Sequence, residues 1–183
     1  TSFSVRPYEF VSQAAPAGAV SSTAADMARY MTMLLNGGTL DGQTIFNPQT
    51  SAGFRTVSDR AAAGAGGFAH GFMEYRLPGN RLGYGHGGVT LSFMSNMVVI
   101  PELGLGVFIS TNSETGYDLE ATLPGKIVQR FYGPAPAAPR VSAWLKANAG
   151  DFTGQYLSSR RAFHGMEKFV GLFNGRESVK VDG

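Results

Sequence analysis

The sequence predicts a domain that combines helices with an antiparallel sheet, and three observations support this prediction. An apolar stripe at helical spacing runs over residues 23–35. Near residue 73 the pattern changes to alternating apolar and polar residues, which indicates strands with one buried face. Short turns separate these strands, and short connections between successive strands imply an antiparallel meander.

The first helix has a defined start, face and end. Thr23 is a capping residue with Asp26 three positions later, as in a capping box. Asn36-Gly37-Gly38 ends the segment, because glycine accepts the left-handed conformation that a helix C-terminus needs. The residues between them that form one apolar face are Met27, Tyr30, Met31, Leu34 and Leu35. A second, short helix is expected from Asn47-Pro48 to about Val57.

Four strands are expected next, at residues 73–77, 81–86, 89–100 and 105–111. Pro78-Gly79-Asn80 forms the first turn and Pro101 to Gly104 the last. A further helix is predicted at 117–132, with a break or kink at Pro124 because proline lacks the N–H that a helix interior uses.

A Pro/Ala-rich linker at 133–140 predicts the domain boundary. We therefore expect a first domain over 1–132 and the start of a β-rich second domain over 141–183. In the second domain, Asn174-Gly175 favours a hairpin between strands Lys168–Phe173 and Ser178–Val181. Both chain ends have the character of cuts within a longer protein.

Composition narrows the function classes. The 183 residues are 43% hydrophobic, which is enough for a packed core, and only 15% charged. A net charge of +2 without a Lys/Arg cluster gives no support to nucleic-acid binding. No cysteine is present, which excludes disulfides and thiolate metal sites, and His70, His86 and His164 lack metal-site spacing. No metal or cofactor is expected.

The stretch Gly83-Tyr84-Gly85-His86-Gly87-Gly88 is the main candidate for a functional motif. It matches G-x-G-x-x-G by letters, but a dinucleotide site needs a helix after the glycines, and Val89 onward is typical of a strand. A purely structural alternative is that the glycines permit close packing or a bulge.

Several stretches together resemble one known family. They are Pro16 to Gly38, Tyr84-Gly-His-Gly-Gly-Val89, Met97 to Val107, and Ser110-Thr-Asn112. Over about residues 15–132 the chain resembles the second half of the serine β-lactamase and penicillin-binding-protein family, in the branch similar to class C enzymes and their esterase and peptidase relatives. The resemblance implies an α/β fold with a mostly antiparallel sheet flanked by helices, incomplete in this chain. Residues 150–183 resemble the accessory β domain that some members carry.

The resemblance also implies an active site with three motifs: Ser-x-x-Lys, Tyr-x-Asn, and a triplet on an edge strand that is often Lys-Thr-Gly. His86-Gly87-Gly88 falls at the triplet, where His86 would bind a substrate carboxylate or move protons. The backbone N–H of Val89 would be an oxyanion donor, while Tyr84, Gly87 and Gly88 would contact substrate. Glycine at 87 lacks the hydroxyl that binds a β-lactam carboxylate, which favours an esterase or D-amino-acid peptidase over a lactamase.

Neither Ser-x-x-Lys nor Tyr-x-Asn is present in the sequence. The prediction is therefore a piece of a serine hydrolase that acts through an acyl-enzyme on small-molecule or peptide substrates, inactive without the N-terminal half of its parent chain. An exported, periplasmic or cell-surface location is expected from the resemblance. Two alternatives stay open: a non-catalytic binding or sensor protein on the same scaffold, and an unrelated β-rich cell-surface module.

Overall fold

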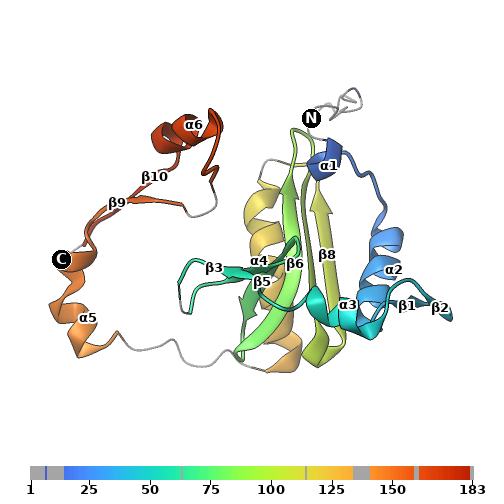
Figure 1. Cartoon of the computed structure of the whole chain (residues 1–183). Coiled ribbons are helices and arrows are strands. Elements are labelled where there is room, and N and C mark those ends of the chain that lie inside the picture. Colours follow the sequence, from blue (N-terminus) through green and yellow to red (C-terminus); the bar gives the residue numbers. More distant parts are fainter. Residues whose placement is uncertain are drawn as a thin grey trace, which may run out of the picture. The chain divides into compact units, whose positions relative to one another are not determined.

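The computed structural model describes residues 7, 15–62, 64–113, 115–133, 141–158 and 161–181. The chain divides into two compact units, residues 1–136 and 137–183 (Figure 1). The predicted linker at 133–140 lies almost wholly outside the described residues.

A six-stranded antiparallel sheet forms the centre of the first unit, in the order β3-β4-β5-β6-β7-β8. Its strands are β3 (Asp59–Arg60), β4 (Gly67–Ala69), β5 (Phe72–Leu77), β6 (Arg81–Val89), β7 (Met94–Ile100) and β8 (Leu105–Thr111). Every strand pairs with its neighbour in sequence. The antiparallel meander expected from the short turns is therefore confirmed.

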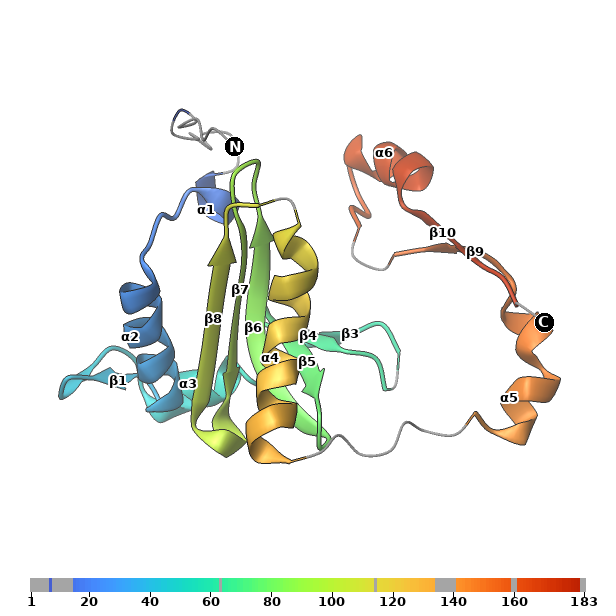
Figure 2. The same cartoon turned by 180° about the vertical axis from the view of Figure 1, so that it is seen from behind.

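Helices cover both faces of this sheet (Figures 1 and 2). On one face lies α2 (Ala24–Leu35), which buries Met31 and Leu34 against Met97 and Val99 of β7. On the other lies α4 (Gly116–Tyr132), which buries Val128 in a second cluster with Leu77, Val98 and Ile100. Alternate β7 residues thus fill two separate cores, as the two-residue strand period requires.

The helix starts follow their capping residues. Thr23 accepts a hydrogen bond from the Asp26 N–H at 3.1 Å, which confirms the predicted cap of α2. Asn47 caps α3 (Pro48–Gly53) through the N–H of Thr50 at 2.8 Å. This helix is shorter than the expected span to Val57. The N–H of Phe54 makes the last bond to a carbonyl four residues back, and the N–H groups of Arg55 and Thr56 instead donate to carbonyls three residues back. The smaller elements are α1 (Ala15–Gly18), β1 (Thr39–Leu40), β2 (Gln43–Thr44) and the 3-10 turn η1 (Pro101–Leu103).

The expected strand over 89–100 is wrong at its start. Val89 ends β6, and a tight turn at 90–93 precedes β7. Thr90 explains the turn, because its hydroxyl accepts from the N–H groups of Ser92 and Phe93 while its own N–H donates to the Phe93 carbonyl. A run of strand-forming residues hid this turn from the sequence pattern.

The expected break at Pro124 is also wrong, since α4 runs unbroken from Gly116 to Tyr132. Proline at 124 leaves the carbonyl four residues earlier, that of Glu120, without its helical N–H partner. Asn96 of β7 replaces the missing donor, because its Nδ2 donates to the Glu120 carbonyl at 3.1 Å. The sheet therefore supplies the hydrogen bond that proline removed.

The second unit contains α5 (Ala143–Ala147), the 3-10 turn η2 (Ala149–Phe152), β9 (Gly154–Leu157), α6 (Glu167–Asn174) and β10 (Arg176–Val179). The predicted strand Lys168–Phe173 is wrong: these residues lie in α6. Met166, Phe169, Val170 and Phe173 follow helical spacing, which the hairpin interpretation of Asn174-Gly175 overlooked. Accordingly β10 pairs with β9, in the register Arg176 with Leu157.

Candidate functional site

The predicted triplet lies where β6 extends beyond β5. The β5 register ends at the pair Met73–Gly85, whereas the β7 register continues to Val89–Met94. Among the described residues, positions 86–89 of β6 therefore have a strand partner on the β7 side alone. The expectation of an edge strand holds for these four residues only, because the first half of β6 lies inside the sheet.

Backbone geometry fixes which groups face this free edge. Thr90 donates its N–H to Phe93 at 2.9 Å, so this pair is hydrogen-bonded across the hairpin. In an antiparallel ladder, successive residues point their N–H and C=O groups to opposite sides. The backbone N–H and C=O groups of His86 and Gly88 thus face β7. Those of Gly87 and Val89 face the free edge.

The His86 side chain bends toward the same edge. It is exposed, and its Nδ1 lies 2.5 Å from the Gly87 carbonyl oxygen. A carbonyl can only accept, so Nδ1 carries the proton and, in the neutral ring, Nε2 is free to accept. An imidazole and backbone groups without a strand partner thus meet at one edge.

The glycines of β6 divide into two kinds. A Cβ on Gly83 would press on Val98 and Leu77, and a Cβ on Gly85 would overlap the Met97 carbonyl. These two glycines serve packing, as the structural alternative supposed. A Cβ on Gly87 would meet ordinary contact distances of 3.6 Å or more, and one on Gly88 would meet nothing within 4 Å.

Tyr84 lies apart from this edge. Its ring packs against the core cluster beneath α2, and it lines a small hollow with Leu34, Phe54 and Arg55. Burial, and then the nearby Glu74 charge, raise the pKa of the Tyr84 hydroxyl. The packing shows that Tyr84 contributes to the core beneath α2, and its predicted contact with substrate stays a prediction.

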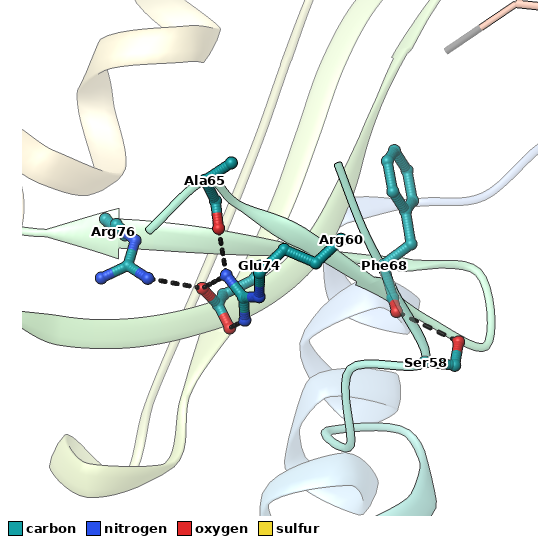
Figure 3. A network of polar contacts seen from close by, with 6 residues as sticks. All are labelled: Ser58, Arg60, Ala65, Phe68, Glu74 and Arg76. Carbon is teal, nitrogen blue, oxygen red and sulfur yellow. Dashed lines mark hydrogen bonds and ion pairs between the residues drawn. The ribbon is translucent and has the colours of Figure 1, made fainter. Parts of the chain in front are cut away.

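The charges around Glu74 form a compact network (Figure 3). Arg60 donates to both Glu74 carboxylate oxygens, at 2.9 and 3.2 Å, and also donates to the Ala65 carbonyl. Arg76 contacts the same carboxylate at 3.4 Å. The hydrogen bond from Arg60 holds the pKa of the Glu74 carboxyl below its usual value. This network joins β3 to β5.

Sequence reasoning missed a polar cluster on the α4 side of the triplet. Asn96, Tyr75 and Glu120 come from β7, β5 and α4, and both Asn96 and Glu120 are buried. The Tyr75 hydroxyl donates to Asn96 Oδ1 at 3.1 Å. Burial raises the pKa of the Glu120 carboxyl, and a hydrogen bond from Asn96 partly opposes this rise. Two signals were available: a proline four residues after Glu120, and an asparagine beside the apolar run 97–100.

Two further features of the described residues bear on function. No group of three or more His, Asp or Glu side chains that could hold a metal ion occurs among them. The helices described also include none that is long and apolar enough to cross a membrane.

The fold is that of a known class of proteins. A solved structure, the octameric penicillin-binding protein homologue from Pyrococcus abyssi, matches with a TM-score of 0.51 and 18% sequence identity. The match covers 88% of this chain and 33% of that one, so the chain spans about a third of the length of that solved protein. Both share the α/β fold with an antiparallel sheet between helices, which confirms the predicted fold class.

The family follows from the sequence itself. The Beta-lactamase family model matches residues 1–129, and the chain belongs to this family. The scaffold is therefore that of a serine hydrolase-like protein, as the resemblance implied. No curated protein matches the chain.

Proposed function

We propose that this chain forms one wall of a serine hydrolase active site that works by acyl-enzyme formation. In this proposal the nucleophile and its base come from a preceding part of the parent protein, and the acyl group comes from an ester, an amide or a D-amino-acid peptide. The observation that carries the proposal is the convergence of the Val89 N–H, the His86 ring and two glycines without side chains at the free edge of β6.

Each group has a chemical task at this edge. The Val89 N–H is not used by the β7 ladder, so it is free to donate to the oxyanion of a tetrahedral intermediate. His86 Nε2 is free to accept a proton from, or return one to, the reacting groups. The missing side chains at 87 and 88 let the acyl group lie close to the strand.

The proposal is tested on the full-length parent protein with a p-nitrophenyl ester as substrate. Replacing Val89 by proline removes its N–H, and because that N–H faces the free edge, the β7 ladder keeps its bonds. We expect V89P to lower kcat by about 10²–10³, the usual effect of losing an oxyanion donor. V89A keeps the N–H and is expected to lose far less.

Two results would count against this function. Equal activities of V89P and V89A would show that the N–H of residue 89 does not stabilise the oxyanion. Absence of any turnover that a serine-directed phosphonate abolishes would favour a non-catalytic binding or sensor protein on the same scaffold. The isolated chain 1–183 is expected to show no such turnover, since Ser-x-x-Lys is absent from it.

A further inference from the structure

Three oxygen atoms surround the place where Gly87 lacks a side chain. Measured from that Cβ position, the Ser95 carbonyl oxygen lies at 3.6 Å, Glu120 Oε2 at 3.8 Å and Asn96 Oδ1 at 3.9 Å. They come from two elements, β7 and α4, and they are the three nearest heavy atoms outside residues 86–88. Gly87 is half-exposed, so a ligand group that passes along the free edge can reach this space.

All three atoms are hydrogen-bond acceptors. The orientation of the Asn96 amide follows from its partners: Nδ2 must face the Glu120 carbonyl that Pro124 leaves unpaired, so Oδ1 must be the atom that accepts from Tyr75. A carbonyl oxygen can accept twice, and both Oδ1 and the Ser95 oxygen therefore retain capacity for a further donor.

Glu120 brings negative charge to this space without a balancing cation. It is 5% exposed, and the ion pairs formed among the described residues involve Asp41, Glu74 and Glu102 but not Glu120. A buried carboxylate without a cation is costly, and burial accordingly raises the pKa of Glu120. A positively charged ligand group would relieve this cost.

We propose that the space above Gly87 is a subsite for a primary ammonium group of the substrate, held by Glu120, Asn96 Oδ1 and the Ser95 carbonyl. An ammonium has three N–H donors and no acceptor, which matches three acceptor oxygens that line one space. Its nitrogen would lie beyond the Cβ position, farther from the Gly87 Cα and within hydrogen-bond distance of the oxygens. The inference rests on the proposed function, because it assumes that the Val89 N–H receives the acyl oxygen. It makes cationic acyl groups the preferred substrate class and carboxylate-bearing ones the disfavoured class.

The strand sets the distance between the ammonium and the reacting carbonyl. Gly87 and Val89 are two residues apart, about 7 Å along a strand. The α-amino group of an amino-acid ester lies too close to its own carbonyl group. It cannot reach the space above Gly87 while the carbonyl oxygen accepts from the Val89 N–H. The geometry therefore favours an amine at the far end of a chain of about five or six bonds, a length that follows from this spacing.

The test uses the full-length parent protein and three p-nitrophenyl esters of equal length: 6-aminohexanoate, heptanoate and the monoester of adipate. They end in an ammonium, a methyl group and a carboxylate. We expect kcat/KM for the ammonium ester to exceed that for the methyl ester by about tenfold, with the carboxylate ester lowest, because opposite charges attract and like charges repel in a desolvated site.

Three variants test whether the preference for the ammonium ester depends on the space above Gly87. E120Q, which keeps the shape and removes the charge, should reduce the preference for ammonium over methyl to about unity. G87S retains the charge but fills the space, and it should abolish the preference as well. D118N is the matched control, because it removes an exposed acid from the same helix and should leave the preference unchanged.

The outcomes separate the two proposals. If the wild type hydrolyses the methyl ester but shows no preference for the ammonium ester, the subsite proposal is wrong and the proposed hydrolase function stands. The same holds if E120Q keeps the preference. If no ester turns over in a phosphonate-sensitive way, the hydrolase proposal fails and the subsite fails with it.

Discussion

At the scale of single residues, the glycines of β6 differ in what they tolerate. Gly85 lies against the Met97 carbonyl, so a methyl group there forces the two strands apart, whereas Gly87 has room for one. We expect G85A to lower the free energy of unfolding by about 1–3 kcal/mol, as overpacking does. G87A, the matched control on the same strand, should change it by less than about 0.5 kcal/mol. Urea denaturation measures both, and equal losses would contradict the distinction.

Glu120 gives the stability a pH dependence of known sign. Because burial raises its pKa, the folded chain binds this proton more tightly than the unfolded chain does. Its stabilising contribution is therefore complete below the unfolded pKa of about 4.3 and is lost as the pH rises through the folded value. E120Q lacks this loss, so its free energy of unfolding should improve relative to wild type as the pH rises toward neutrality.

Glu74 has the opposite pH dependence. The pKa of Glu74 is lowered, chiefly by its hydrogen bond from Arg60, so its contribution is present above the unfolded pKa and disappears as the pH falls through the folded value. The free energy of unfolding of E74Q should accordingly be furthest below that of the wild type at neutral pH, and the difference should shrink in acid. Denaturation curves over a pH series would test both variants, and parallel pH profiles for the two would contradict the assignment.

At the scale of elements, Asn96 and Pro124 should be energetically coupled. N96A leaves the Glu120 carbonyl without a donor and the Tyr75 hydroxyl without its Asn96 acceptor, which we expect to cost about 1–3 kcal/mol. In a P124A background, alanine returns an N–H to the Glu120 carbonyl. The same N96A change should then cost about 1 kcal/mol less, which a double-mutant cycle measures.

A distant pair provides the control for this cycle. T23A removes the cap of α2 and should cost about 1 kcal/mol. Combined with N96A, it should add within about 0.5 kcal/mol, since the two sites share no partner. Additivity of N96A with P124A would show that the sheet does not replace the hydrogen bond lost at proline.

The elements also show what the sequence could and could not predict. The helix 24–35 and the meander followed from local signals, a cap and a two-residue period, which act within one segment. The continuity of α4 depends on Asn96, which lies 28 residues from Pro124 in the sequence, and no local rule anticipates such a bond. The triplet at 86–88 could be recognised from its letters, but its acceptor-lined side comes from β7 and α4 and required the structure.

At the scale of the whole molecule, the two units differ in how well they are packed. β7 has five consecutive buried residues, 96–100, whereas the residues of 141–158, 161–173 and 175–181 are all exposed or half-exposed. Backbone amides in such a segment open at low free energy, while those of a central strand open only with global unfolding. We therefore expect hydrogen exchange to be slowest at 96–100 and fast throughout β9 and β10.

The single tryptophan allows the second unit to be followed alone. Trp144 is 64% exposed and lies in α5, so its fluorescence reports on the second unit, while far-ultraviolet circular dichroism is dominated by the larger first unit. During urea titration we expect a cooperative dichroism transition without a coincident change in tryptophan emission, because the indole is already in water before the sheet unfolds. A tryptophan transition that coincides with the dichroism midpoint would instead require the second unit to be folded together with the first, and slow exchange in β9 would have to accompany it.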